Sequence, residues 1–337
     1  MNSCRARARN DFKAAPRRQR GVALLIALIL VALATVLATK LTFDGFLERR
    51  RAVGVLAAEQ ALQFGMGAEA LAADVLSRDL QNSTTTLAAP WAQATQPMPI
   101  TPQDDPEGEP IGTLEGSLED MQGRFNLNNL GRLTTDGKQD PQPLEQFQRL
   151  LALVGLESKW AGIARDWIDA DDLPGSPDGA EDSIYTSQTP PYRTGNWPMM
   201  SASELMNLPG FGAERYRKIE PYVTALPTAM AAVNICTASA FVLESLADNL
   251  SGNFSGSPDA LTNGRKNGCF PDATTFGNIL GGPTAIAKLT GQYGTKSQYF
   301  RLTTRVTLGT TEFTLYSLLV RSGGGKITPL LRSFGTP

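Results

Sequence analysis

The part of the sequence with the most chemical potential is a cluster of carboxylates. Seven of the seventeen residues from 166 to 182 are acidic and none is Lys or Arg; the acids are Asp166, Asp169, Asp171, Asp172, Asp178, Glu181 and Asp182. Like charges at this density repel one another unless a cation lies among them. Oxygen ligands on a loop that contains Gly and Pro suit calcium rather than a soft transition metal. The pattern predicts a calcium site, and a solvated acidic loop is the alternative.

The two ends of this loop carry the residues that we expect to bind the ion. The sequence turns through Gly175, Pro177 and Gly179, and Glu181 follows ten residues after Asp171. We therefore predict four ligands, with Asp172 and Asp178 as weaker candidates: Asp169, Asp171, Glu181 and Asp182. The loop is a poor match to an EF-hand, because its sixth position counted from Asp169 is Pro174 where that motif has Gly.

Catalysis has little support in the composition. The 337 residues include no histidine, which excludes Ser-His-Asp and Cys-His catalytic sets and His-ligated zinc. Paired acids can hydrolyse glycosides, but spacing in sequence does not give the separation in space that this reaction needs. We expect a protein that is not an enzyme.

A second motif is Leu-Pro-Gly-Phe-Gly at 208–212, which lies between two short helical segments and resembles a helix-hairpin-helix. Its glycines permit a tight turn and expose amides that can hold a phosphate. Arg215, Arg217 and Lys218 are available for DNA, but three nearby acids oppose them: Glu204, Glu214 and Glu220. We expect a structural hairpin, with non-specific DNA binding as the alternative.

The N-terminus is basic and then apolar. Residues 1–21 hold seven basic groups and one acid, a net charge of +6, so the remainder must be −2 − 6 = −8. From Val22 to Ala38 the sequence is apolar apart from Thr35. A basic flank before an apolar run predicts membrane targeting with the flank in the cytoplasm and the body exported. Signal peptidase could cut at the small-residue site 32–34, or a different peptidase could cut before the apolar run.

The remaining elements follow from periodicity. Apolar positions continue without proline to Leu80 and predict one long helix, Val22–Leu80, with a break near Gly45 or Gly65 as the alternative. Strand-like segments are Ile111–Glu119, Gly123–Leu127, Gln298–Leu308 and Thr311–Arg321, and 81–110 is a proline-rich loop. Because strands precede and follow a mainly helical block, we expect that block to be an insertion in a sheet.

Three cysteines are present. Cys4 lies in the basic leader and would be lost on processing. Cys236 and Cys269 remain in the exported body, so we predict a disulfide between them.

The leader, Gly21 and the apolar helix together resemble the class III signal of type IV pilins and pseudopilins. The resemblance implies that a prepilin peptidase cuts between Gly21 and Val22, which makes Ile26 the fifth mature residue. Most of these proteins have Glu there, and its loss is typical of the K-type minor pseudopilins of type II secretion. The segment DWIDADDLPGSPDGAEDSIY resembles their calcium-binding loop, and the hairpin and the final strands follow in the same order.

This resemblance implies an α+β pseudopilin fold with a long N-terminal transmembrane helix, a small antiparallel sheet and a large inserted helical domain. The implied divisions are a leader at 1–21, a transmembrane and stem helix at 22–80, a sheet domain from 81–136 and 290–337, and an inserted domain at 137–289. The calcium would be structural.

The implied function is that of a minor pseudopilin at the tip of the type II secretion pseudopilus, involved in protein secretion across the outer membrane. Its implied partners are the minor pseudopilins I and J, with H left open, and the prepilin peptidase, and no nucleic acid. It would cross the bacterial inner membrane once, with its main domain in the periplasm. The alternatives are a membrane-anchored helix-hairpin-helix protein for DNA binding or uptake, and a pilin-like protein of another assembly.

Overall fold

The structure is a computed structural model that describes residues 20–93, 95–102, 104–105, 107–246, 262–279, 286–287 and 289–336. Residues 1–19 of the predicted leader, Cys4 among them, lie outside the described residues. The chain divides into two compact units, residues 1–58 and 59–337, and the boundary falls within one helix.

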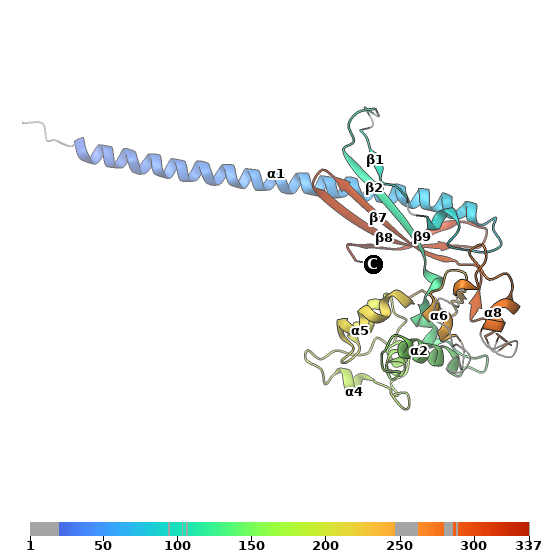
Figure 1. The fold of residues 1–337 in the computed structure, drawn as a ribbon. Coiled ribbons are helices and arrows are strands. Elements are labelled where there is room, and N and C mark those ends of the chain that lie inside the picture. Colours follow the sequence, from blue (N-terminus) through green and yellow to red (C-terminus); the bar gives the residue numbers. More distant parts are fainter. Residues whose placement is uncertain are drawn as a thin grey trace, which may run out of the picture. The chain divides into compact units, whose positions relative to one another are not determined.

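That helix is α1, Arg20–Asp79, a single element as expected (Figure 1). Neither Gly45 nor Gly65 interrupts it. The absence of a side chain matters at Gly65, because a Cβ there would lie only 3.0 Å from Cδ2 of Leu315 on the sheet. Glycine therefore lets the helix approach the strand closely. Among the described residues, α1 is the one helix long and apolar enough to cross a membrane, and its most apolar stretch is entirely unburied.

Five antiparallel strands form the main sheet in the order β1-β2-β7-β8-β9 (Figure 1). The strands are β1 Met98–Ile100, β2 Gly112–Asp120, β7 Tyr299–Leu308, β8 Thr311–Arg321 and β9 Ile327–Phe334. The predictions for β2, β7 and β8 are right to within one residue. Neither edge strand was predicted. β1 lies inside the proline-rich segment, and β9 contains Pro329 and a register shift opposite Leu318 and Leu319.

The second half of α1 packs on this sheet. Ala72 and Leu76 pack with Phe300, Leu302 and Leu319 in one buried cluster. Nearer the N-terminus of the same helix, Ala61 and Ala68 form a second cluster with strand residues such as Val306 and Leu114. Small residues on the helix face and branched residues on the strands thus join the two layers.

The predicted strand Gly123–Leu127 was wrong in length and place. Only Phe125–Asn126 is extended, as β3, and it pairs in parallel with β4, Val223–Thr224, away from the main sheet. The side chains explain the short strand. Asn128 donates Nδ2 to the backbone oxygen of Met199 at 2.9 Å and accepts the Met199 N–H at 2.7 Å. Asn129 pairs with Ala231 in the same way, at 2.8 and 3.0 Å. Hydrogen bonds from these two side chains thus take the place of the backbone hydrogen bonds that a longer strand would make.

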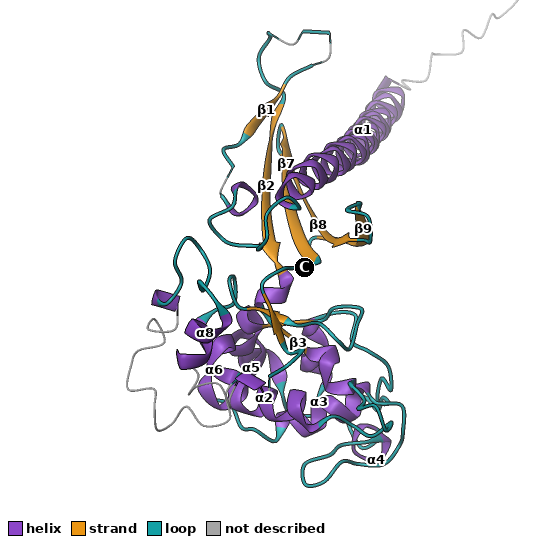
Figure 2. Cartoon of the chain, turned by 90° about the vertical axis from the view of Figure 1, so that its right-hand side faces the viewer, coloured by secondary structure: helices purple, strands orange, loops and turns teal. Residues whose placement is uncertain are grey.

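Between β2 and β7 the chain forms a helical insert (Figure 2). Its described helices are α2 Pro141–Leu153, α3 Trp160–Ile168, α4 Asp182–Tyr185, α5 Gly212–Ile219, α6 Ala240–Ser245 and α8 Ala273–Ile279, and two further short strands, β5 Val233–Asn234 and β6 Tyr293–Gly294, pair in parallel. The insert has its own buried core, in which Phe125 stacks on Phe147. A disulfide joins Cys236 and Cys269 of the insert, which is the pair that the sequence predicts.

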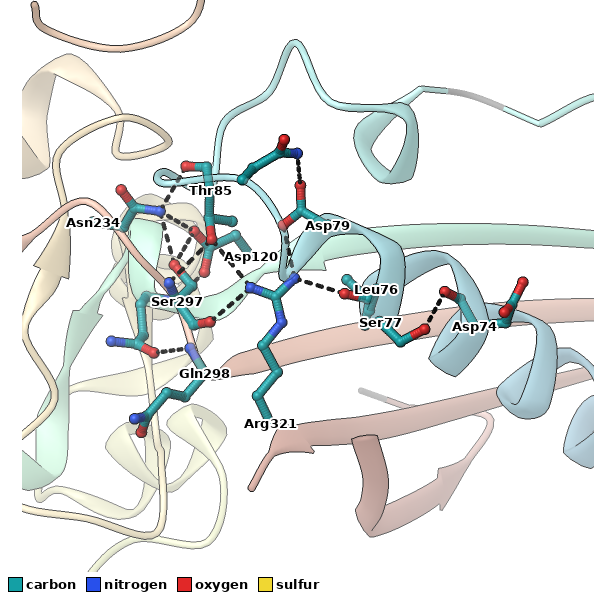
Figure 3. A network of polar contacts seen from close by, with 12 residues as sticks. Asp74, Leu76, Ser77, Asp79, Thr85, Asp120, Asn234, Ser297, Gln298 and Arg321 are labelled. Atoms are coloured by element: carbon teal, nitrogen blue, oxygen red, sulfur yellow. Dashed lines mark hydrogen bonds and ion pairs between the residues drawn. The ribbon is translucent and has the colours of Figure 1, made fainter. Parts of the chain in front are cut away.

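A buried polar network fastens the insert to the sheet (Figure 3). Asp120 ends β2 and is 4% exposed. Its carboxylate accepts four hydrogen bonds: from Asn234 Nδ2 at 2.9 Å, Thr237 Oγ1 at 2.6 Å, Ser297 Oγ at 2.6 Å and Gln122 N at 2.9 Å. Asn234 and Thr237 belong to the insert, so one carboxylate on the sheet fixes it at this point.

Candidate metal centre

Three of the predicted ligands lie together. Asp169, Asp171 and Glu181 each offer one carboxylate oxygen, and these three oxygens lie within 4.8 Å of one another. Asp169 occupies the C-cap position of α3, and Glu181 occupies the N-cap position of α4 without a capping hydrogen bond from its side chain. The ends of two helices thus hold the acids that the loop between them brings together.

The buried side chain of Asp166 stabilises the fold of this loop. It is fully buried on α3, and its Oδ2 accepts the backbone N–H groups of Gly175 and Ala180, both at 2.9 Å. The two bonds close the turn between the ends of the loop. Gly179 is required here, because any Cβ at that position would overlap Asp166 Oδ2 and the backbone of Gly175. Asp166 belongs to the acidic cluster that is evident in the sequence, but its position there does not predict this role.

Buried oxygens without a hydrogen bond gather at the site. They are Asp166 Oδ1, Asp169 Oδ1 and both carboxylate oxygens of Glu181, none of which has a partner among the described residues. Glu181 is only 3% exposed. A buried anion without a partner costs several kcal/mol, on the order given for an unpaired charge. While these carboxyl groups are ionised their oxygens can only accept, so the missing partner is a hydrogen-bond donor, a proton or a cation.

The pKa shifts of the clustered carboxyl groups also indicate uncompensated negative charge. Burial and the negative charges of Asp166 and Asp169 raise the pKa of Glu181 to about 7. Burial likewise raises the pKa of Asp169 to about 6, and the neighbouring carboxylates of Asp166 and Asp171 add to the rise. A divalent cation would remove the repulsion that contributes to both shifts.

The other predicted residues are bound elsewhere. Asp182 Oδ1 accepts from the backbone N and the Oγ1 of Thr194, at 3.1 and 3.0 Å, and its Oδ2 lies 3.3 Å from the Arg193 guanidinium. Asp172 accepts from Asn196 Nδ2 at 3.0 Å. Asp178 is exposed on the turn. The group that the structure brings together is therefore Asp169, Asp171 and Glu181, without Asp182.

Asn196, which contacts Asp172, is a residue that the sequence did not suggest. Its Oδ1 is buried and has no partner among the described residues, and its backbone φ is 42°. It lies 24 residues from Asp172 in sequence, beyond the acidic segment, and no acidic spacing pointed to it. The three clustered side chains Asp169, Asp171 and Glu181 offer only oxygen ligands, which suit a hard cation such as calcium, whose shell holds six to eight oxygens. The residues present fit calcium.

In the hairpin, Arg215 makes its contacts within the chain itself. The 3₁₀ helix Ala202–Asn207 and α5 flank the turn, where Gly210 has φ of 82° and Gly212 of 71°. Arg215 donates Nη1 to the backbone oxygens of Gly210 and Phe211, at 3.0 and 3.2 Å. Its guanidinium also lies 5.3 Å from the ring centre of Trp160. These contacts favour the structural interpretation of the hairpin.

The fold and the site together define a class. An apolar N-terminal helix whose second half packs on an antiparallel sheet is the architecture of a pilin-like subunit. The helical insert between neighbouring strands, with its acidic loop, distinguishes the K-type pseudopilins within that class.

Comparison with known proteins agrees. Residues 123–228 match the family model "Type II secretion system (T2SS), protein K". The type II secretion system protein K of Pseudomonas aeruginosa is 34% identical over 332 residues, covering 95% of this chain and 94% of the relative. That of Aeromonas hydrophila is 32% identical over 338 residues, covering 95% and 98%. The chain belongs to the type II secretion system protein K family, whose members are structural components of the secretion apparatus.

A solved structure gives the same fold. A chain in the crystal structure of the GspK-GspI-GspJ complex from enterotoxigenic Escherichia coli aligns with a TM-score of 0.73 and 27% identity. The alignment covers 85% of this chain and all of that one.

Proposed function

We propose that this chain is the minor pseudopilin at the tip of a type II secretion pseudopilus and has no enzymatic activity. The observation that carries the proposal is the helical insert between β2 and β7, two neighbouring strands of a pilin-like sheet. The insert adds a second core, larger than that of the sheet itself, to a subunit whose relatives serve secretion. Such bulk would prevent a further subunit from stacking above this one. Ile26 supports the same position, because a subunit with no neighbour ahead of it has no use for a buried Glu there.

Its proposed partners are the minor pseudopilins I and J, since the related GspK chain was crystallised in a complex with GspI and GspJ. The test is co-purification of the full chain with the I and J subunits of the same cell, followed by mass measurement of the complex. A complex with one copy of each subunit supports the proposal. Duplex DNA binding that weakens steeply with salt, in place of that complex, would favour the DNA-binding alternative.

For localisation we propose a single inner-membrane pass by the apolar part of α1, with the insert and sheet in the periplasm. Prepilin peptidase would cut between Gly21 and Val22 and leave an N-methylated valine. N-terminal sequencing should begin at Val22, and Gly21→Ala should block the cut. A sequence that begins at Thr35 would show ordinary signal-peptidase cleavage and contradict the pilus role.

We further propose that the acidic loop binds a structural calcium ion. Asp169, Asp171 and Glu181 would bind it directly, and four buried, unpaired oxygens support a cation at this place. The sequence-based proposal of Asp182 as a fourth ligand has less support, because Thr194 and Arg193 already contact its carboxylate.

Calcium should raise the melting temperature of the full chain, since only the folded chain has the site. At a calcium concentration a hundred times the dissociation constant, the gain is about 2.7 kcal/mol. Glu181→Gln should abolish the response, whereas Glu214→Gln, at an exposed acid on α5, should keep it. Equal melting in calcium and in chelator would show that the loop is only a solvated acidic surface.

A further inference from the structure

Three consecutive arginines follow the apolar part of α1. Arg49, Arg50 and Arg51 are exposed, and the same stretch of the helix carries two acids, Asp44 and Glu48. Among the residues that the structure describes, none of the three arginines has a carboxylate within ion-pair distance, although both acids are close to them in sequence. Their guanidinium groups therefore have no counterion in the described part of the chain. Water can solvate them, so the position of the cluster on the helix decides which partner it fits.

The length of the helix places this cluster just beyond the membrane core. A hydrocarbon core of about 30 Å takes about 20 residues at 1.5 Å each, so a span that begins at Val22 ends at about Thr42. The polar groups inside that span are satisfied, because the hydroxyls of Thr35, Thr39 and Thr42 donate to backbone oxygens one turn earlier, at 2.7, 2.8 and 2.8 Å. The backbone of Arg50 lies about 12 Å beyond the end of the core.

The arginine side chains reach back towards the membrane. In an α-helix the Cα–Cβ bond points towards the N-terminus, so a long side chain covers the turn before its own residue. Arg50 does so, because its Cζ lies 5.4 Å from the ring centre of Phe46, one turn earlier. One turn is about 5 Å, which brings the charge to about 7 Å from the core. A bilayer of about 40–45 Å in all leaves about 5–8 Å of headgroups on each side, so the charge lies at headgroup depth.

The directions of the three side chains favour lipid over a protein neighbour. Consecutive residues of an α-helix point about 100° apart, so Arg49, Arg50 and Arg51 face three different sides of α1. A neighbouring subunit would contact one side, whereas a layer of headgroups surrounds the whole helix. A guanidinium group also matches phosphate in charge and in shape, because it can donate two parallel hydrogen bonds to phosphate oxygens. The cluster therefore fits a ring of lipid phosphates.

We propose that Arg49, Arg50 and Arg51 form a collar that binds the headgroups of anionic phospholipids in the periplasmic leaflet of the inner membrane. The proposal rests on the membrane pass proposed above and adds a lipid-binding surface to it. Phosphatidylglycerol would bind better than phosphatidylcholine, because the ammonium group of phosphatidylcholine offsets the charge of its phosphate. The collar would fix the depth of α1 in the membrane before the subunit joins the pseudopilus.

The experiment uses the processed chain that begins at Val22, because the basic leader would bind the same lipids on the other side of the membrane. The chain is placed in phosphatidylcholine bilayers with a trace of spin-labelled lipid, and electron spin resonance gives the affinity of each labelled lipid for the protein surface. Labelled phosphatidylglycerol should bind about fivefold more tightly than labelled phosphatidylcholine at low salt, the ratio expected for one arginine contact. Replacing all three arginines with Gln should bring the ratio to about one, and replacing them with Lys should keep most of it.

Two controls separate the collar from net charge and from free phosphate. Replacing Lys138, Arg217 and Lys218 with Gln removes the same charge from exposed positions of the compact unit 59–337, and should leave the ratio unchanged. Sodium phosphate and sodium chloride at equal ionic strength should lower the ratio of the wild type equally, because both act by screening. All variants should melt at the temperature of the wild type, since the changed side chains are exposed.

Four results would count against the inference. An equal lipid ratio in the wild type and in the Gln variant of the collar would overturn the collar while the membrane pass stands. An equal fall in the control variant would show a general effect of net charge. A larger fall in phosphate than in chloride would show a site for free phosphate in place of a lipid surface. Release of the chain from membranes by alkaline carbonate would overturn the membrane pass and the collar together.

Discussion

Arg321, the last residue of β8, and Asp79, the last residue of α1, form a buried ion pair in which Nη2 lies 2.7 Å from Oδ2 (Figure 3). Their side chains are 7% and 3% exposed. The same guanidinium donates to the Leu76 backbone oxygen at 3.1 Å and to Ser297 O at 3.3 Å, and it lies 4.6 Å from the ring centre of Phe300. One arginine thus joins the end of the helix to the sheet.

Removal of Arg321 should be severe. Arg321→Met leaves Asp79 buried without its cation, which typically costs about 3–5 kcal/mol in the free energy of unfolding. The double variant Asp79→Leu, Arg321→Met should lose less than the sum of the two single changes, because no charge stays buried alone. Urea unfolding measures all three variants. Strict additivity would mean that the two groups do not interact.

Asn128 should be irreplaceable in the turn after β3. Its amide donates to the backbone oxygens of Met199 and Leu226 and accepts the Met199 N–H. Asn128→Ala should cost about 2 kcal/mol or more, since buried backbone groups lose their partners. Asn128→Asp should cost at least as much despite its equal size, because a carboxylate would face two carbonyl oxygens. A mild effect of the aspartate, measured by thermal melting, would contradict this assignment.

Glu69 should make stability depend on pH. Burial raises the pKa of this carboxyl, but hydrogen bonds from Arg332 and Ser317 outweigh it, so the pKa lies below its ordinary value of 4.5. A group whose pKa is lower in the folded chain stabilises above the unfolded pKa, and the contribution is lost as pH falls. Glu69→Gln should therefore lower the free energy of unfolding by its full amount at about pH 6 and by progressively less below about pH 4.5. A penalty independent of pH would exclude the ionised pair.

The disulfide should contribute through the unfolded chain. Cys236 and Cys269 are 33 residues apart, and closing a loop of that length restricts the unfolded state by about 3–4 kcal/mol in the entropy model. Replacing both with alanine should lower the free energy of unfolding by that order. Cys4→Ala, in the predicted leader, is the matched control and should change nothing. Equal stability of the double variant and the wild type would refute the expectation.

Local patterns predicted most of the fold, and long-range contacts account for what they missed. The apolar run of α1 and the alternation in β7 and β8 belong to single segments, so they could be read directly. The edge strand β9 carries Leu330 and Leu331 in succession, both exposed, and this pattern does not alternate as a strand buried on one face would. The length of the predicted strand Gly123–Leu127 was overestimated, because Asn128 and Asn129 bind residues about 70 and 100 positions away.

At the candidate site the types of the residues could be predicted, but the directions in which their side chains point could not. The acids between 166 and 182 were evident as a group. Asp182 and Glu181 are adjacent, yet one contacts Thr194 and the other lies beside Asp169. The turn that separates them depends on Asp166, whose two backbone bonds no spacing rule predicts.

The position of the insert has a consequence for how the chain reaches its native state. The β2–β7 ladder closes with Asp120 opposite Phe300, so both ends of the insert emerge from one pair of facing residues in the sheet. Bringing the ends of a disordered segment of this length together carries an entropic cost before any strand contact forms. A segment that has already folded around Phe147, with its termini side by side, presents β2 and β7 to each other at a much lower cost. The insert should therefore become protected from hydrogen exchange before the sheet, and the ladder should form last.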